Sequence, residues 1–418
     1  MLSASVSTEK LSDDAWIRLA DMDKPLALIG CDELLAHFTS ILCAWPHETG
    51  PGLPQGESPF LFVERRGCNY SMHLELTNQS KIFSDPVDLV CAAIVEIAWE
   101  TLRCNPDWLC LHCAAVEKNG RLIIFPNMRR AGKTTLTTAL GLRGLNVYTD
   151  DFMALTVQND GQVLGMASGI ATRMRLPWPR NISGAFKIGL SSSELVRGAR
   201  YSYHAVSRNM PVRRGHRSPV GAVVILDFEN DRKAELLPIN RAEALRATIT
   251  QNFSRAGNSG RILQILYFLI CNLKTFRLRY SDTEEAADLI ENHFGSWETP
   301  LPKEPALKPG LASHIAPDFT MNQNRLRLPT GKQFVRSPDV VEYELDDTRF
   351  LADGKGYGIY KLDQLSGAAW NVLETPATAD EIIELFQQAF PDQPVDRIAC
   401  DVQKLLRGLL RNRLITDI

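Results

Sequence analysis

Regularly spaced apolar residues divide the first 300 residues into short helices and strands. The spacing predicts helices over Asp14 to Ala20, Cys31 to Leu42, Pro86 to Arg103 and Arg241 to Gln251. It predicts a hairpin over Phe60 to Leu76, where the polar stretch Glu64 to Asn69 separates two apolar runs, and a central strand over Val220 to Phe228. Strands interspersed with helices in this way indicate an α/β protein.

The pattern changes after Ser296. Residues 297–337 contain repeated prolines and little periodicity, which predicts a linker stiffened by proline. Three strand-like pieces follow, over Val340 to Leu345, Arg349 to Leu351 and Tyr357 to Leu362, and then three amphipathic helices. Strands followed by helices over about eighty residues predict a winged-helix-like α+β unit that folds on its own.

A loop of small and basic residues follows the apolar run Leu122 to Phe125 and ends in Gly-Lys-Thr. A strand, such a loop and a helix make a phosphate cradle, in which backbone N–H groups face the anion, Lys133 adds charge and the Thr134 hydroxyl can ligate Mg²⁺. Asn127 stands where a standard P-loop has glycine, and Arg130 where related loops have a small residue. The predicted nucleotide-binding residues are Asn127, Arg129, Arg130, Ala131, Gly132, Lys133, Thr134 and Thr135.

Two adjacent carboxylates, Asp150 and Asp151, end the next short apolar segment. Neighbouring side chains of a strand point to opposite faces, so the two can do different work. Phosphoryl transfer needs both a metal ligand and a group that accepts the proton of the attacking hydroxyl. An Asp-Asp turn is the simpler alternative, but the position close behind Gly-Lys-Thr favours a functional pair.

His112 is the third candidate. Leu111 to Val116 predicts a buried strand, and Glu117 to Gly120 a hairpin turn into Leu122 to Phe125. A lone histidine on an apolar strand is usually a core residue. This one would lie in the sheet that carries the loop, which favours a functional role.

In chain order, His112, the loop through Lys133 and Thr134, and Asp150-Asp151 resemble the catalytic domain of HPr kinase/phosphorylase and the HPr-kinase-related kinases. The resemblance covers about residues 85–296 and includes Arg173 to Arg180 and Phe276 to Tyr280. It implies an α/β P-loop kinase domain that uses ATP and Mg²⁺. It further implies Lys133 on the β and γ phosphates, Thr134 and Asp151 on the metal, and Asp150 as the base towards a protein hydroxyl, assisted by His112.

The C-terminal unit resembles the PqqD family of precursor-peptide recognition elements. The matching stretches are Tyr360 to Asp363, Ser366 to Trp370, Ala379 to Ile382 and Leu409 to Ile415. The resemblance implies that a leader peptide adds as a strand beside the third strand, with a helix as the other wall, and that Ile359, Tyr360 and Lys361 bind it. A DNA-binding winged helix is the competing interpretation, but the helices carry many acidic residues where phosphate contacts require Lys or Arg.

Composition and charge limit the expected binding partners and cellular compartment. The chain has 418 residues, 23% of them charged, and a net charge of -3, which gives no general attraction to nucleic acid or to an anionic membrane. The N-terminal residues lack a signal-peptide pattern, and the apolar run Ile262 to Cys271 is too short to span a bilayer, so we expect a cytoplasmic protein. Nine scattered cysteines favour free thiols over disulfides. The basic loop Arg213 to Arg217 could grip a phosphate, although most such clusters are solvated.

The sequence therefore predicts an N-terminal lid or docking subdomain (1–104), an HPr-kinase-like P-loop domain (105–296), a linker (297–337) and a PqqD-like domain (338–418). The expected function is an ATP-dependent kinase for a Ser or Thr hydroxyl on a small protein or ribosomally made precursor peptide. The alternatives are a catalytically inactive nucleotide-binding scaffold that presents a peptide to a separate enzyme, and a small-molecule kinase. Whether the chain forms a homo-oligomer is left open.

Overall fold

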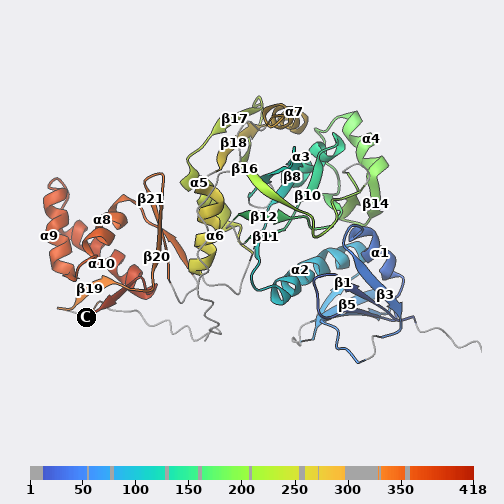
Figure 1. Cartoon of the computed structure of the whole chain (residues 1–418), viewed down its shortest axis with the longest axis horizontal. Coiled ribbons are helices and arrows are strands. Elements are labelled where there is room, and N and C mark those ends of the chain that lie inside the picture. Colours follow the sequence, from blue (N-terminus) through green and yellow to red (C-terminus); the bar gives the residue numbers. More distant parts are fainter. Residues whose placement is uncertain are drawn as a thin grey trace, which may run out of the picture.

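The computed structural model of the chain describes residues 13–53, 56–75, 80–127, 131–158, 162–206, 210–253, 259–271, 273–296, 328, 331–353 and 358–418 (Figure 1). Two of the predicted site residues, Arg129 and Arg130, and most of the proline-rich stretch lie outside these ranges. The described residues form a mixed α/β protein with several sheets.

The N-terminal unit is a sheet with the strand order β3-β1-β2-β4-β5-β6 and two helices. Its elements are β1 (Ala15–Leu19), β2 (Leu26–Ile29), α1 (Leu34–Ile41), β3 (His47–Pro51), β4 (Leu61–Arg66), β5 (Asn69–Leu74), β6 (Ser80–Phe83) and α2 (Pro86–Cys104). The hairpin and the helices α1 and α2 confirm the predictions. The helix predicted over Asp14 to Ala20 is wrong, because this segment is strand β1. Ala15, Ile17 and Leu19 are buried and alternate with half-buried residues, which is the period of a strand.

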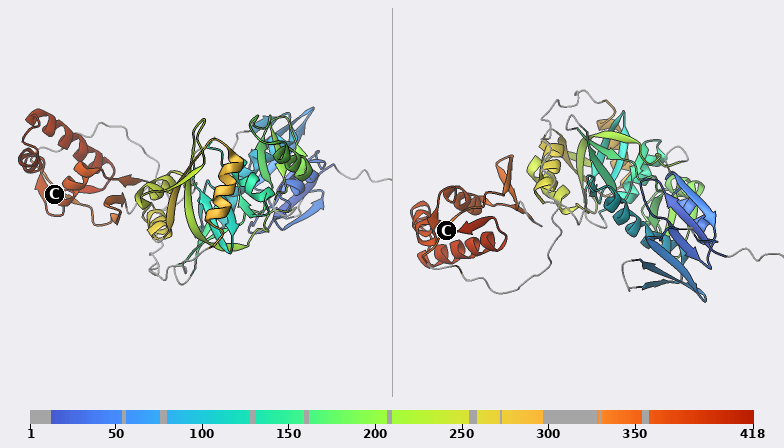
Figure 2. Two further views of the ribbon diagram at one scale, coloured as in Figure 1. Left: turned by 90° about the horizontal axis from the view of Figure 1, so that it is seen from above. Right: turned by 60° about the horizontal axis from the view of Figure 1, so that its bottom comes forward.

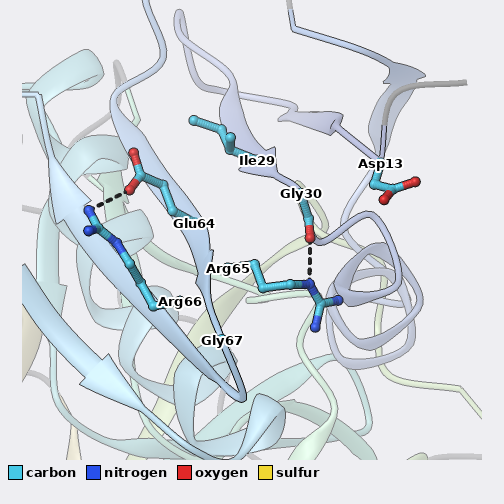
Figure 3. Close-up of a pocket in the computed structure, with 7 residues that line it drawn as sticks. All are labelled: Asp13, Ile29, Gly30, Glu64, Arg65, Arg66 and Gly67. Carbon is cyan, nitrogen blue, oxygen red and sulfur yellow. Dashed lines mark hydrogen bonds and ion pairs between the residues drawn. The ribbon is translucent and has the colours of Figure 1, made fainter. Parts of the chain in front are cut away.

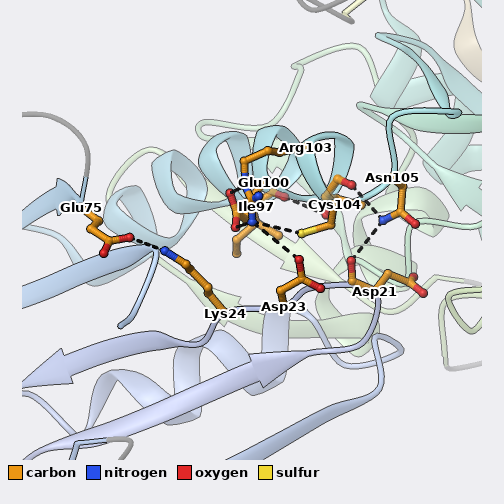
Figure 4. Close-up of polar contacts among 10 residues, drawn as sticks. Asp21, Asp23, Lys24, Glu75, Ile97, Glu100, Arg103, Cys104 and Asn105 are labelled. Atoms are coloured by element: carbon orange, nitrogen blue, oxygen red, sulfur yellow. Dashed lines mark hydrogen bonds and ion pairs between the residues drawn. The ribbon is translucent and has the colours of Figure 1, made fainter. Parts of the chain in front are cut away.

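Polar contacts tie the loop after β1 to the end of α2 (Figure 4). The amide of Asn105 donates to the carbonyl of Asp21 over 3.2 Å, and Lys24 pairs with Glu75 at 2.5 Å. Arg103 lies 3.8 Å from Asp23. The loop after β1 thus contacts both the end of α2 and Glu75, which follows β5.

The central sheet has the order β10-β8-β9-β16-β12-β11-β7, with β18 beside β16 and β17 beside β18. Its strands are β7 (Leu109–Leu111), β8 (Ala114–Lys118), β9 (Arg121–Phe125), β10 (Asn146–Thr149), β11 (Met153–Val157), β12 (Val163–Met166), β16 (Arg217–Phe228), β17 (Glu235–Pro238) and β18 (Lys274–Tyr280). Strand β8 is antiparallel to both β9 and β10. Strands β9 and β10 therefore run in the same direction and end at the same edge of the sheet.

Helices cover both faces of this sheet. Ile123 and Phe125 face a cluster with α3 (Lys133–Leu142), α4 (Gly184–Ser193) and α7 (Thr283–His293). Leu122 and Ile124 face a cluster with α5 (Arg241–Thr250) and α6 (Ser259–Cys271). A strand buried on both sides explains the uninterrupted apolar run before the loop. A small sheet with the order β13-β15-β14 packs beside α1, α2 and α3, and consists of β13 (Thr172–Arg175), β14 (Glu194–Arg197) and β15 (Tyr201–His204).

The C-terminal unit contains the three predicted helices, α8 (Gln364–Val372), α9 (Ala379–Ala389) and α10 (Val395–Arg411). One sheet has the order β20-β21-β22, from β20 (Val341–Leu345), β21 (Thr348–Ala352) and β22 (Ile359–Lys361). The other joins β19 (Gln333–Arg336) to β23 (Ala377–Thr378) and β24 (Ile415–Asp417). Strand β19 lies in the stretch that we had assigned to the linker, so the C-terminal unit extends at least as far back as Gln333.

The sheet β20-β21-β22 is shared between units. Phe350 and Ala352, on one face of β21, are buried against α6, whereas Leu351 on the other face belongs to the core formed by α8 to α10. In Figure 1 the β20–β21 hairpin lies between α6 and these helices, and the two views of Figure 2 show the same order. The expectation of a self-contained C-terminal unit therefore needs revision, because one sheet face is covered by the preceding unit. No helix in the described part of the chain is long and apolar enough to cross a membrane.

Candidate active site

A cavity of about 660 Å³ opens where β9 and β10 end. Predicted site residues line it together: His112, Ala131, Gly132, Lys133, Thr134, Thr135, Asp150 and Asp151. Helix α2 supplies Ile94 and Ala98 to its wall, and the end of α5 with the residues after it supplies Thr250 to Phe253. The N-terminal unit thus contributes a wall of the cavity through α2.

The loop enters α3 through Gly132, whose φ of 84° lies in the left-handed region that favours glycine. A Cβ at Gly132 would also collide with Oη of Tyr280, so a side chain there would displace the tyrosine. The Tyr280 hydroxyl donates to the carbonyl of Ala131 over 3.4 Å. Gly132 is therefore required both by its backbone conformation and by the tyrosine packed on the loop.

Asn127, which we predicted to bind nucleotide, does not line the cavity. Its side-chain amide donates to the carbonyl of Leu226 over 2.8 Å, and its side-chain oxygen accepts from the Leu226 N–H over 2.7 Å. The side chain thus ties the end of β9 to β16. The Asn127 carbonyl accepts from Nζ of Lys133 at 2.5 Å, which holds the ammonium group over the loop. The replacement of glycine by Asn127 is structural in this arrangement.

Asp150 lies at the buried bottom of the cavity and is 7% exposed. The Thr134 hydroxyl donates to Oδ2 of Asp150 over 3.1 Å, and the Arg173 backbone N–H donates to the same oxygen over 3.2 Å. Burial and the neighbouring charge of Asp151 raise the pKa of Asp150 to about 6. A hydroxyl and a carboxylate side by side are the hard oxygen donors that Mg²⁺ prefers, so these residues fit that ion.

Asp151 is more open, with 32% of its side chain exposed, and it lies between two basic groups. Nε2 of His112 is 3.2 Å from Oδ1, and a guanidinium nitrogen of Arg173 is 3.1 Å from Oδ2. Burial raises the pKa of Asp151, but the His112 hydrogen bond and the Arg173 charge outweigh it and hold the pKa at about 2. Asp151 is therefore ionised at neutral pH.

The carboxylates are paired differently from the expectation. We expected Thr134 with Asp151 on the metal and His112 beside Asp150, but Thr134 contacts Asp150 and His112 contacts Asp151. The cause is an interruption of the strand that we predicted over Leu111 to Val116. Strand β7 ends at Leu111 and β8 begins at Ala114, so His112 is in the connection between them. Leu111 pairs with Met153 in β11, which brings His112 beside Asp151.

Sequence reasoning missed two residues that hold this arrangement. Arg173 follows the start of β13, and its guanidinium also contacts Sγ of Cys91 at 2.8 Å and the ring of Tyr201. Oε1 of Gln251 lies 3.0 Å from Nδ1 of His112 and accepts a hydrogen bond from it. Arg173 lay within a stretch that resembled the kinase family, but no local pattern linked it to Asp151. Gln251 is far from His112 in the chain, and nothing local marks it.

Two other basic regions do not form a comparable site. Arg214, in the middle of the basic loop, is buried against the ring of Trp45 at 3.7 Å and pairs with Asp21 at 3.0 Å, so this arginine is not available to a phosphate. A more open depression of about 700 Å³ in the N-terminal unit is lined by Arg65 and Arg66 (Figure 3). Arg65 pairs with Glu33 and Arg66 with Glu64, which neutralises these charges locally.

The predicted peptide-binding residues lie together on β22. Ile359 packs against the α6 cluster, Tyr360 packs on the core of α8 to α10, and Lys361 is exposed. Strand β22 pairs with β21 on one side. On the other side, no strand of the described residues pairs with it.

These features define a mixed α/β protein in which a loop, two carboxylates and an arginine converge on one cavity, with a separate strand-edge surface on its C-terminal unit. Residues 349–415 match the family model for Coenzyme PQQ synthesis protein D (PqqD), so this unit is of the PqqD type, as the sequence predicted. A solved structure described as that of the Hpr(Ser) kinase/phosphatase from Coxiella burnetii aligns over 44% of this chain and 95% of that chain. It does so at 13% sequence identity and a TM-score of 0.25, which does not establish a common fold. No curated protein matches the chain in sequence.

Proposed function

We propose that the chain is an ATP-dependent kinase that phosphorylates a Ser or Thr hydroxyl on a peptide or small protein, which its PqqD-type unit recruits. The observation that carries this proposal is the convergence of Lys133, Thr134, Asp150 and Asp151 on one cavity. A cation for the phosphates, oxygen ligands for a metal and an ionised carboxylate open to an acceptor are the parts that phosphoryl transfer requires.

The roles of the two carboxylates follow from their exposure and partners. Thr134 and Asp150 would hold Mg²⁺, because their oxygens are 3.1 Å apart at the buried end of the cavity. Bound Mg²⁺ would neutralise the phosphates and favour departure of the nucleoside diphosphate. Asp151 would accept the proton of the attacking hydroxyl, because it is exposed to the cavity and stays ionised. This exchanges the roles that the sequence had implied for Asp150 and Asp151.

His112 and Arg173 would position Asp151 and stabilise charge. With both ring nitrogens facing polar partners, His112 is held in one orientation and supports Asp151 rather than acting as the base itself. Arg173 would place a positive charge beside the γ phosphoryl group during transfer. In this proposal ATP is the phosphoryl donor, Mg²⁺ is the bound metal, and the recruited peptide or small protein is the acceptor.

The test is phosphoryl transfer from γ-labelled ATP to peptides encoded beside the gene, with calorimetry of ATP binding in parallel. The Lys133→Ala chain should lose at least about tenfold in ATP affinity, because a charge-assisted contact to the phosphates is removed. Lys118→Ala, which removes an ion pair with Glu291 on the surface, is the matched control. Unchanged ATP binding by Lys133→Ala would contradict the nucleotide site. ATP binding without transfer to any such peptide would favour the inactive scaffold.

A further inference from the structure

The cavity has an apolar wall as well as a polar floor. Five side chains form this apolar wall, from α2, from the residue after Asp151 and from the segment that follows α5: Ile94, Val95, Ala98, Phe152 and Phe253. These side chains carry no hydrogen-bond donor or acceptor, so they do not suit the phosphates of a nucleotide. The kinase chemistry proposed above gives the apolar wall no role.

The apolar wall is part of the core of the N-terminal unit. Ile94, Ala98 and Phe152 are 8% exposed or less and belong to that core, and Phe253 packs against it. The ring of Trp99, on α2, stacks on Phe253 with centroids 4.2 Å apart. A wall supported from behind in this way is preorganised, because few of its side chains have to be ordered when a ligand binds.

Val95 gives the apolar wall its most accessible surface, with 41% of the residue exposed. All other residues from Pro86 to Leu102 of α2 are buried or half-buried. A single exposed valine on a helix is ordinary. Val95, however, lines the cavity next to four other apolar side chains, so its exposed surface is available to a ligand in the cavity.

The segment that carries Phe253 is tied to the segment that carries His112. The Phe253 N–H donates to the carbonyl of Cys110 over 2.7 Å, and the His112 N–H donates to the carbonyl of Gln251 over 2.8 Å. Nε2 of His112 lies 3.2 Å from Oδ1 of Asp151. Phe253 is therefore held on the side of the cavity where Asp151 lies.

The side of the cavity where Asp151 lies is the acceptor's side in the proposed reaction. The attacking and leaving oxygens of phosphoryl transfer lie roughly in line, on opposite sides of the phosphorus. The carboxylate that takes the acceptor's proton and the nucleoside diphosphate would thus be on opposite sides as well. Phe152 directly follows Asp151 in the chain. The apolar wall would therefore face the molecule that carries the hydroxyl, and not the nucleoside.

We infer that the apolar wall binds a large apolar side chain next to the acceptor hydroxyl, so that the substrate is a peptide segment in which Ser or Thr adjoins a residue such as Leu or Phe. Val95 is then a residue that determines specificity. A small hydrophilic acceptor such as a sugar would leave this wall in contact with water and gain nothing from it. The inference rests on the proposed function and names the peptide sequence that its acceptor site selects.

The first test is a positional scan with the full-length chain, γ-labelled ATP and an arrayed library of serine-centred peptides in which one position at a time is fixed. At one of the two positions adjoining the serine, Leu or Phe should raise transfer about tenfold or more over Gly, because filling an apolar pocket has an effect of that size. Labelling with no apolar preference beside the serine would overturn the inference and leave the kinase intact.

Val95→Asn tests the apolar wall itself. It should lower the ratio of transfer to Leu-flanked over Gly-flanked peptides several-fold, because the apolar contact is lost. Ile82→Asn is the matched control: it replaces an exposed apolar residue of the same unit outside the cavity and should keep the ratio. Calorimetry should give both chains the same ATP affinity. An unchanged ratio in Val95→Asn, or a loss of its ATP affinity, would overturn the inference, the latter by assigning the wall to the nucleoside.

A cross-linking measurement does not depend on transfer. A peptide with a photoreactive leucine analogue beside its serine is mixed with the full-length chain, Mg²⁺ and a non-hydrolysable ATP analogue. It should cross-link to Ile94 to Ala98 of α2 or to Phe253. Such cross-links without any labelling from ATP would reject the kinase and keep the apolar wall as a peptide site. The absence of cross-links at these residues would overturn the inference even for a peptide that is phosphorylated.

Discussion

The hydroxyl of Thr134 donates to Oδ2 of Asp150 across 3.1 Å. This contact joins the first turn of α3 to the end of β10 and holds the two proposed metal ligands together below the loop. Asp151, the next residue, turns the other way towards His112 and Arg173. The two adjacent carboxylates after β10 therefore contact different groups: Asp150 contacts Thr134, and Asp151 contacts His112 and Arg173.

The two carboxylates should therefore respond differently to neutralisation. Asp150→Asn should weaken Mg²⁺-dependent ATP binding, because a metal ligand loses its charge. Asp151→Asn should leave that binding nearly unchanged and lower phosphoryl transfer by roughly 10²-fold or more, because the proton acceptor is lost. Calorimetry with and without Mg²⁺, beside transfer assays, separates these effects. If Asp150→Asn binds Mg²⁺-ATP normally and only transfer fails, the roles are those implied by the sequence.

Asp150 should also make stability depend on pH when neither nucleotide nor metal is bound. Its pKa is raised to about 6, so between about pH 4 and pH 6 the folded chain keeps a proton that the unfolded chain releases. Stability should therefore rise as the pH falls from 6 to 4, by on the order of 2 kcal/mol from this group. Asp151, with a pKa of about 2, acts oppositely and loses its stabilisation only as the pH falls below about 4.

The measurement is urea unfolding in a chelator across this pH range, with Asp150→Asn as the comparison. The difference in unfolding free energy between the two chains should change with pH only if Asp150 titrates as stated. A difference that stays constant from pH 4 to 6 would reject the raised pKa.

Gly132→Ala should destabilise the chain more than Gly144→Ala. Both glycines have positive φ, and an alanine at such a position costs roughly 1–2 kcal/mol. Only the Cβ at position 132 meets a neighbour, the Tyr280 hydroxyl, whereas nothing lies within 4 Å at position 144. Adding Tyr280→Phe to Gly132→Ala should recover the excess loss, read from thermal unfolding. No recovery would mean that the tyrosine does not restrict the loop.

The shared sheet can be tested at Phe350 and Arg241. Phe350→Ala should cost about 3–5 kcal/mol of unfolding free energy, because its ring is buried against α6. Arg241, at the start of α5, pairs with Asp346 of the β20–β21 turn at 2.7 Å and donates to the Cys271 carbonyl at the end of α6. Arg241→Ala breaks both contacts and should therefore speed hydrogen exchange in α6 and in β20–β21 together. Arg246→Ala, an exposed arginine of the same helix, should change neither. Exchange that rises in one element alone would show that the contact does not hold the units together.

Much of the fold was accessible from the sequence because local signals agreed with it. The apolar run Leu122 to Phe125 became β9, and Gly-Lys-Thr opens α3 through the left-handed Gly132. The segment from Asp14 was assigned the wrong element although Ala15, Ile17 and Leu19 alternate, because a short apolar run fits either period. The strand through His112 was predicted without its break, since the two parts pair with different strands.

Long-range contacts could not be predicted from local patterns. Arg173 reaches Asp151 because β13 lies beside the residues that follow β10, where the Arg173 N–H donates to Asp150, and Gln251 reaches His112 from the end of α5. Periodicity gives the buried face of a strand but not what covers it. The apolar run Phe350 to Ala352 in β21 therefore left open that Phe350 would pack on a helix of another unit.

The cover that α6 gives to Phe350 and Ala352 also limits how this architecture can be recombined. A C-terminal unit transplanted onto another enzyme at the proline-rich stretch would carry a bare apolar sheet face, and the donor chain would keep an uncovered helix. Exposed patches of that kind promote aggregation. A functional chimera would have to exchange α5, α6 and the β20–β21 hairpin as one block, so the C-terminal unit is inherited with a piece of the unit that carries the cavity.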